Sequence, residues 1–134
     1  MLLKIWREVS GYDHGPEAAL LNYYHPSARM GLHQDKDEEA EEAPVVSLSL
    51  GLSARFRFGG QRRRDPTQSY LLVSGDVIVF GGKARLCYHG IDRILKTPPK
   101  GREADVQQLA AEVGALANQQ PGRLNITLRR VTKP

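Results

Sequence analysis

Two residues that commonly bind metals, His33 and Asp35, stand one residue apart in the stretch GLHQDKDE. Imidazole and carboxylate groups are ordinary ligands for divalent transition metals. On a β-strand these two side chains would point to the same face, because side chains alternate with a period of two. The pair alone is a weak signal, since about 0.2 such pairs are expected by chance in a chain of this composition. A metal site therefore needs a third ligand from another part of the chain.

His89 is the candidate for that third ligand. It ends the stretch ARLCYH and is followed at once by Gly90, so a different strand could carry it to the same point. Two histidines and one carboxylate on one face of an octahedral metal leave three positions open, as in the non-haem Fe(II) oxygenases. The sequence holds no set of thiolates that would favour zinc or an iron–sulfur cluster. A polar cluster at a strand edge is the alternative interpretation of the three residues.

The stretch RLNITLRR near the end of the chain carries Arg123, Asn125 and Arg129 at even separations. On a strand all three would therefore share one side. Two guanidinium groups suit a small dicarboxylate, because arginine binds carboxylates with paired hydrogen bonds and stays charged. Asn22 and Tyr24, also two residues apart, could add neutral hydrogen bonds from a neighbouring strand. Solvated arginines and purely structural Asn and Tyr side chains are the alternatives.

Short runs rich in β-forming residues would position these side chains. They cover residues 18–24, 29–33, 45–52, 55–58, 69–73, 76–80, 84–89 and 124–131. Several alternate between apolar and small or polar residues, as half-buried strands do. Eight such strands predict a mainly β fold, a sandwich or a barrel made of two sheets.

Two segments have helical rather than strand patterns. Residues 2–9 predict a short N-terminal helix, and apolar residues at helical spacing predict a second helix over residues 103–119. This second helix would be inserted before the last strand. We expect a single domain over residues 1–134, with a helix and linker at 1–17 and the β core at 18–131.

Composition and charge limit the possible partners and the possible cellular location of the protein. The net charge of +4 and the pI near 9.4 permit a polyanionic partner without requiring one. No run of eighteen apolar residues predicts a transmembrane helix, and the N-terminus does not resemble a signal peptide. A single cysteine fits a reducing cytosol, so we expect a cytoplasmic protein. A monomer is expected.

The segments NYYHPSARMGLHQDKDE, VVSLSLGL, FRFGG, GDVIVFGG, YHGI and RLNITLRR together resemble the AlkB-type Fe(II)/2-oxoglutarate-dependent dioxygenases. Those enzymes oxidatively remove alkyl groups from nucleic-acid bases. The resemblance runs from about Asn22 to Arg129 and includes both the His-x-Asp…His and the Arg-x5-Arg motifs in the right order. It implies a double-stranded β-helix, the jelly-roll or cupin-like fold.

The resemblance also implies roles for individual residues. It implies that iron is held by His33, Asp35 and His89. It implies that 2-oxoglutarate is bound by Asn22, Tyr24, Arg123, Asn125 and Arg129, with Arg123 at the distal carboxylate and Arg129 near the chelating end. On the substrate side, it implies that Asp37 approaches the damaged base and that Arg63 contacts the substrate. A solvated acid within KDEEAEE and a surface arginine are the alternatives for these last two.

The sequence departs from the family pattern at three places. Only about twenty residues precede Asn22, so the N-terminal lid that covers the nucleotide in the family is expected to be absent. The interval from His89 to Arg123 is long because it contains the predicted helix. Phe80 stands where tryptophan is common.

The function predicted in this way is Fe(II)/2-oxoglutarate-dependent oxidative demethylation of N-alkylated bases in DNA or RNA, as in alkylation repair. Fe(II), 2-oxoglutarate and O2 are the expected cofactors, and alkylated single-stranded nucleic acid is the expected partner. Two alternatives stay open: a 2-oxoglutarate oxygenase acting on a protein or small molecule, and a non-catalytic relative that binds nucleic acid or a partner protein.

Overall fold

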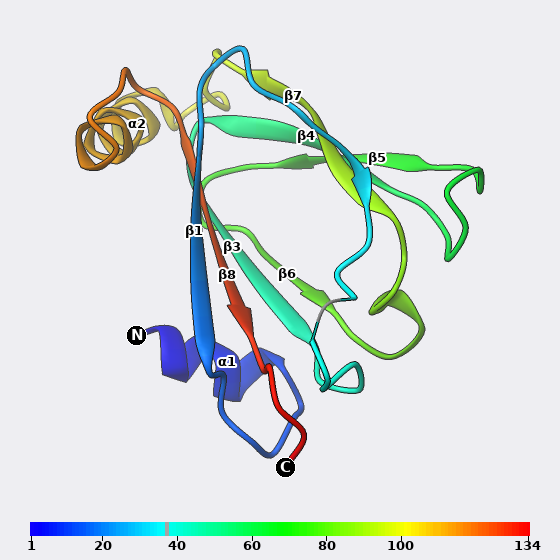
Figure 1. The fold of residues 1–134 in the computed structure, drawn as a ribbon. Coiled ribbons are helices and arrows are strands. Elements are labelled where there is room, and N and C mark those ends of the chain that lie inside the picture. Colours follow the sequence, from blue (N-terminus) through cyan, green and yellow to red (C-terminus); the bar gives the residue numbers. More distant parts are fainter. Residues whose placement is uncertain (37) are drawn as a thin grey trace.

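The computed structural model describes residues 1–36 and 38–134, and its strands form two four-stranded antiparallel sheets that face each other (Figure 1). The first sheet has the order β1-β8-β3-β6 and consists of β1 (Ala18–Tyr24), β3 (Val45–Gly51), β6 (Val77–Phe80) and β8 (Arg123–Arg129). The second has the order β2-β7-β4-β5 and consists of β2 (Met30–His33), β4 (Ser53–Phe58), β5 (Gln68–Leu72) and β7 (His89–Leu95). The predicted mainly β, jelly-roll architecture is confirmed.

Two α-helices pack against the sheets. Helix α1 (Leu2–Val9) buries Trp6 against Val46 and Leu128, which lie on the first sheet. Helix α2 (Glu103–Leu116) follows β7, contacts β3 and β8, and leads into β8. The prediction of a helix inserted before the last strand is confirmed, although α2 ends three residues before the predicted boundary. No helix in the described part of the chain is long and apolar enough to cross a membrane.

The space between the sheets is divided into an apolar and a polar part. Phe56, Ile91 and Ile94 from the second sheet form the apolar core together with Val45 and Phe80 from the first. Strand β3 alternates as the sequence predicted, and its leucine and valine positions at 46 and 48 are buried. Its serines at 47 and 49, however, point toward the interior beside β8. The first sheet therefore presents a polar inner face, and that face carries the candidate site.

The structure corrects one strand. Residues 84–89 do not form the predicted strand: Gly82–Ala84 is a short 3-10 helix (η1), and β7 begins at His89. Local turns explain the difference, because the backbone N–H groups of Arg85 and Cys87 donate to the carbonyls of Gly82 and Ala84. His89 thus begins a strand instead of ending one.

Candidate metal centre

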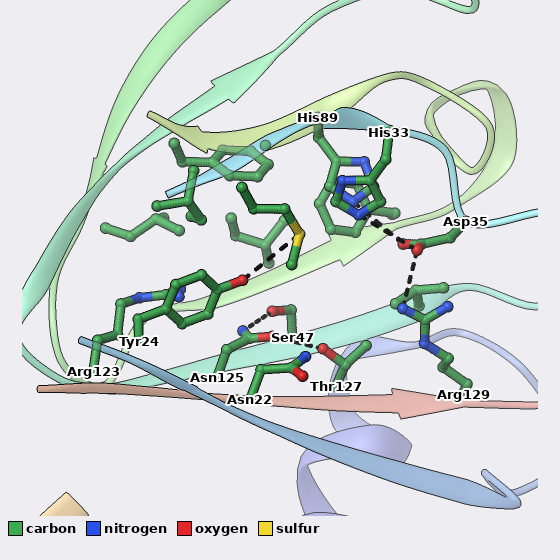
Figure 2. A pocket seen from close by; sticks show the side chains of 18 residues that line it. Asn22, Tyr24, His33, Asp35, Ser47, His89, Arg123, Asn125, Thr127 and Arg129 are labelled. Atoms are coloured by element: carbon green, nitrogen blue, oxygen red, sulfur yellow. Dashed lines mark hydrogen bonds and ion pairs between the residues drawn. The ribbon is translucent and has the colours of Figure 1, made fainter. Parts of the chain in front are cut away.

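Three side chains converge at one end of the sandwich (Figure 2). His33 ends β2, His89 begins β7, and the two stand directly opposite each other in the antiparallel register. Asp35 lies in the loop two residues beyond His33, so the two residues do not share a strand as predicted. Nevertheless Nε2 of His33 lies 3.8 Å from Asp35 Oδ1, and Nε2 of His89 lies 3.3 Å from Asp35 Oδ2. Their ligand atoms all lie within 4.8 Å of one another.

The two imidazoles are oriented by backbone carbonyls. Nδ1 of His33 lies 3.2 Å from the carbonyl oxygen of Gly31, and Nδ1 of His89 lies 3.1 Å from that of Cys87. A carbonyl accepts only from a protonated ring nitrogen, so these contacts assign a proton to each Nδ1 and turn each Nε2 toward the Asp35 carboxylate. Histidines that bind metals are commonly held by this kind of hydrogen bond. The two imidazoles and one carboxylate therefore fit a divalent iron with open coordination positions.

Asp35 is ionised although it is buried. Burial by itself would raise the pKa of this carboxyl, but the hydrogen bond with His89 and the charge of Arg129 outweigh it, so the pKa lies well below its usual range. The guanidinium NH2 of Arg129 lies 3.0 Å from Oδ1. The ring of Phe80 stacks on His89 with centroids 4.5 Å apart and shields one side of the site. The Asp35 carboxylate is therefore in the charged form that binds a metal cation.

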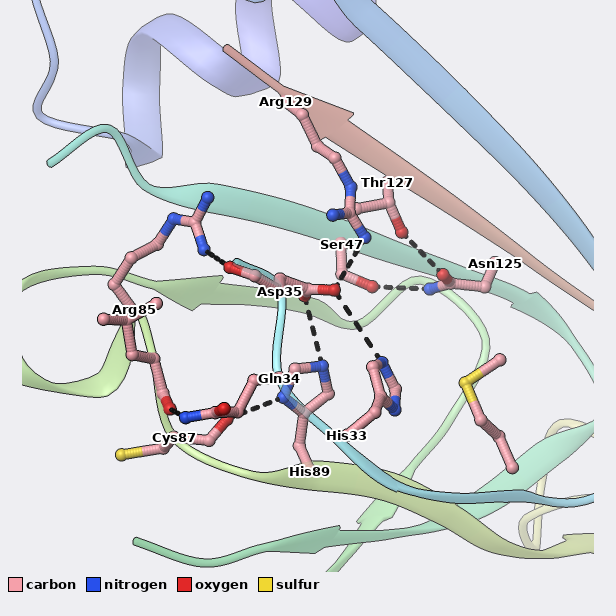
Figure 3. Close-up of polar contacts among 12 residues, drawn as sticks. His33, Gln34, Asp35, Ser47, Arg85, Cys87, His89, Asn125, Thr127 and Arg129 are labelled. Atoms are coloured by element: carbon pink, nitrogen blue, oxygen red, sulfur yellow. Dashed lines mark hydrogen bonds and ion pairs between the residues drawn. The ribbon is translucent and has the colours of Figure 1, made fainter. Parts of the chain in front are cut away.

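A second arginine supports the Asp35 segment (Figure 3). Arg85 is only 3 % exposed; its Nε donates to the carbonyl of Ala43 at 2.8 Å and its NH1 donates to the backbone carbonyl of Asp35. Its NH2 lies 3.4 Å from Glu38 Oε2, while Glu38 Oε1 accepts from Arg129 NH1 at 2.6 Å. Burial raises the pKa of Glu38, but Arg129 more than offsets this and the net pKa is lowered. The two arginines and two carboxylates form one buried network.

Sequence reasoning missed both Arg85 and Glu38. Glu38 belongs to an acidic run that is typical of solvated surface, and Arg85 lies in a stretch that reads as an apolar strand. The arginine inside the apolar stretch ARLCYH was the only signal in the sequence. An arginine that is buried among apolar residues needs ion-pair or hydrogen-bond partners, so it indicates a nearby acid.

The three candidate metal-binding residues line a cavity of about 110 Å³ between the sheets. It is lined from both sheets, and all five residues predicted to bind a diacid line it together with the metal-binding group. Its polar lining consists of Asn22, Tyr24, His33, Asp35, Ser47, His89, Arg123, Asn125, Thr127 and Arg129. The structure thus brings both predicted sets of residues to a single space.

The surroundings of Arg123 favour the binding of an anion. It is 2 % exposed, and its NH2 donates to Ser49 Oγ at 2.9 Å. Its guanidinium carbon lies 5.1 Å from the centre of the Tyr24 ring. Nε has no hydrogen-bond partner, and no carboxylate of the described residues forms an ion pair with this side chain. Burial lowers the pKa of Arg123, as expected for a desolvated charge, so a carboxylate ligand fits here.

Neutral polar side chains line the middle of the cavity. Asn125 donates to Ser47 Oγ and accepts from Thr127 Oγ1, the latter at 2.7 Å. Asn22 pairs with Asn125 across β1 and β8 and lines the cavity from an exposed position. Ser47, Ser49 and Thr127 were not predicted; the alternation of serine with apolar residues in VVSLSLGL was the signal that could have identified the first two.

The residues predicted to contact substrate have different outcomes. Arg63 does not line the cavity. Its NH1 donates to the carbonyl of Leu32 at 3.0 Å, and its guanidinium lies 5.0 Å from the centre of the Tyr88 ring, so it is fixed beside the end of β2. Asp37 lies outside the described residues.

Comparison with known proteins decides the family. The model of the 2OG-Fe(II) oxygenase superfamily matches residues 1–129. The chain belongs to this superfamily. Fe(II), 2-oxoglutarate and O2, the cofactors expected from the sequence, are those of the 2OG-Fe(II) oxygenases. The buried metal-binding group agrees with these cofactors, as does Arg123, which forms no ion pair with the residues that the structure describes.

Several members of the superfamily are similar to this chain. An α-ketoglutarate-dependent dioxygenase AlkB homologue of Caulobacter vibrioides is 43% identical over 133 residues, covering 96% of this chain and 51% of the relative. A DNA N(6)-methyladenine demethylase, ALKBH1C, of Arabidopsis thaliana is 42% identical over 120 residues, covering 86% and 24%. The solved structure of OsALKBH1 matches with a TM-score of 0.66 and 36% identity, covering 96% of this chain and 59% of that one. The resemblance to AlkB-type oxygenases is confirmed, and the chain spans about half the length of the AlkB homologue.

Proposed function

We propose that this chain is the oxygenase core of an Fe(II)/2-oxoglutarate-dependent dioxygenase that demethylates N-alkylated bases in DNA or RNA. One observation carries the proposal: a His-Asp-His group lines the same small cavity as the buried Arg123, which has no carboxylate partner among the described residues. A 2-oxoglutarate oxygenase needs this combination, because the diacid must be anchored at one end while its other end reaches the metal. The names of the AlkB and ALKBH1 relatives support the reaction.

In this proposal His33, Asp35 and His89 hold Fe(II). When bound, iron and 2-oxoglutarate supply the oxidising chemistry: O2 is consumed, the keto acid becomes succinate and CO2, and an N-methyl group leaves as formaldehyde. The chain's own contribution is to keep both Nε2 atoms and the carboxylate in place. The carbonyl contacts to each Nδ1 and the ion pair with Arg129 provide that orientation.

The remaining cavity residues would bind 2-oxoglutarate. Arg123 would take the distal carboxylate, assisted by the Tyr24 hydroxyl, which donates weakly to the sulfur of Met30 at 3.8 Å. Arg129 would stabilise the end near the metal, and Asn22 and Asn125 would donate to the diacid between them. Burial of this pocket excludes water and strengthens each of these interactions.

Nucleic acid is the proposed substrate class, and single strands are the proposed form because a base must leave its stack to reach an enclosed site. Asp37 would attract the cationic ring of an N-methylated base, and Arg63 would contact the strand at the rim. We further propose that residues 1–134 act as one catalytic domain, as a monomer in the cytoplasm; the single cysteine supports a reducing compartment.

Formaldehyde and succinate formation test the proposal. Purified protein with Fe(II), ascorbate and 2-oxoglutarate should form both products from a single-stranded oligonucleotide that carries 1-methyladenine or 3-methylcytosine, and His33→Ala should form neither. Free methylated nucleoside and a methylated peptide are parallel substrates. Succinate without formaldehyde from any nucleic acid would favour an oxygenase of another substrate class. No succinate under any condition would contradict an enzymatic role.

A further inference from the structure

The outer face of the second sheet is basic. Phe56, Ile91 and Ile94 point into the core, so the residues that alternate with them point outward. Arg55 on β4 stands directly opposite Arg93 on β7, and both are exposed. Their place in the register puts the two arginines side by side on the solvent face.

This pair is unfavourable in the protein by itself. Like charges directly opposite each other destabilise a sheet. The nearest compensating acid is Asp92, whose Oδ2 lies 3.9 Å from Arg55 NH1, and both side chains are at least 40 % exposed. An exposed contact at that distance contributes little, and Arg93 has no ion pair among the described residues. The face therefore carries uncompensated positive charge that an external anion would neutralise.

Two adjoining grooves cross this region. One is lined by Ser27, Arg29, Asp92, Arg93, Lys96 and Thr97, together with apolar neighbours. The other is lined by Arg29, Gly31, Arg57, Gly90 and Asp92, again with apolar neighbours, so the grooves share Arg29 and Asp92. Arginine, lysine and hydroxyl side chains are the groups that proteins use to contact phosphates.

The basic surface continues to the rim of the active site. Arg57 donates to Thr67 Oγ1 through Nε at 3.2 Å and NH2 at 2.8 Å, which ties it to the loop between β4 and β5. That loop carries three consecutive exposed arginines at 62–64. One of them, Arg63, donates to Leu32, the neighbour of His33. Cations therefore extend from the metal centre over the outside of the second sheet.

The net charge of this surface differs in sign from that of the rest of the chain. The face and its grooves contribute Arg29, Arg55, Arg57, Arg93 and Lys96, and the loop adds Arg62, Arg63 and Arg64. The acids among them are Asp65 and Asp92. Eight cations against two acids give +6, whereas the whole chain has +4, so all other residues together carry −2. Positive charge is concentrated on this one side.

We propose that the outer face of the second sheet binds the phosphates of the nucleic-acid strand on one side of the base that enters the active site. This inference rests on the proposed function for its ligand class and adds the path of the strand. The contacts are made to phosphates, so they are independent of sequence and sensitive to salt.

The test compares two charge-matched double variants in binding a fluorescent, unmethylated 15-nucleotide single strand, followed by anisotropy between 0.1 and 0.4 M NaCl without Fe(II) or 2-oxoglutarate. Arg55→Gln/Arg93→Gln removes two charges from the basic face. Lys4→Gln/Arg7→Gln removes two exposed charges from α1, which packs on the other sheet (Figure 1).

Each phosphate contact with a single strand contributes about 0.7 to the slope of log K against log salt. Loss of two contacts should lower the slope by about 1.4 and weaken binding about 25-fold at 0.1 M salt, whereas the α1 variant should stay within about 2-fold of wild type. The melting temperature of Arg55→Gln/Arg93→Gln should not fall, because the variant removes a repulsion. Lys96→Gln provides a second, single-charge test.

Equal weakening by the two double variants would overturn the proposal, as would absence of strand binding by the wild-type protein. Loss of binding to anionic vesicles with unchanged oligonucleotide affinity would assign the face to a membrane and also overturn it. Because these measurements involve no turnover, they can fail while the oxygenase reaction succeeds on a free methylated nucleoside, and the reverse also holds.

Discussion

Arg85 offers the sharpest test of how the candidate metal centre is held. Its side chain never touches the cavity, yet it donates to the backbone carbonyls of Asp35 and Ala43 and lies beside Glu38. Replacement by methionine, which has a comparable length, removes all three interactions. Asp35 would then be positioned only through its own carboxylate contacts.

The size of the effect follows from the partners that lose Arg85. Breaking a buried ion pair from one side costs about 3–5 kcal/mol, and Glu38 keeps part of its compensation through Arg129, so we expect about 3 kcal/mol of lost unfolding free energy. A domain of this size commonly has about 5–15 kcal/mol, so Arg85→Met should still fold. Metal affinity should fall about 10- to 100-fold, as for other residues that orient ligands.

Calorimetric titration with Mn(II), an Fe(II) substitute that does not react with O2, measures the affinity, and urea unfolding measures the stability. Arg102→Met is the matched control, since Arg102 also donates to a carbonyl, that of Ser74, and to the carboxylate of Asp105, far from the site. A folded Arg85→Met protein with wild-type Mn(II) affinity would refute the positioning role.

Three further outcomes are expected. Arg123→Met should abolish measurable 2-oxoglutarate binding by calorimetry yet leave the ligand-free protein equally or more stable. The reason is that an apolar group of similar volume replaces a buried charge with no carboxylate partner in residues 1–36 and 38–134; a clear loss of stability would contradict this account. The metal-free protein should lose stability to urea as the pH falls below about 4.5. The folded pKa values of Asp35 and Glu38 lie below their ordinary values, so the unfolded state binds more protons than the folded state in this pH range. Glu38→Gln should flatten this pH dependence. Trp6→Ala should cost about 3–5 kcal/mol in urea unfolding while Mn(II) affinity stays unchanged, since Trp6 packs outside the cavity.

Residue chemistry and order made the two main sets of candidate site residues recognisable in the sequence. His33, Asp35 and His89 are a recognisable ligand set in any order of elements, and the even spacing of Arg123 and Arg129 is meaningful on a strand. The pattern of short alternating runs was likewise enough to predict two sheets. These features are local, so a sequence displays them directly.

Features that depend on distant contacts could not be read in the same way. Arg85 and Glu38 are 47 positions apart, and neither has a local pattern that distinguishes a buried ion pair from surface charge. The interior orientation of Ser49 depends on which face of β3 the helices cover. The start of β7 at His89 depends on turn hydrogen bonds that compete with a sequence rich in strand-forming residues.

The pairing of His33 with His89 across β2 and β7 means that the alignment of the two backbones sets the spacing of the two imidazoles. A slip by a single residue would turn one ring to the opposite side of the sheet. Gly90 allows β2 and β7 to approach closely in this register, because a Cβ there would lie 2.6 Å from the carbonyl oxygen of Met30 and 2.9 Å from that of Gly31. The glycine beside the histidine therefore has almost no freedom to change while the two strands keep this register.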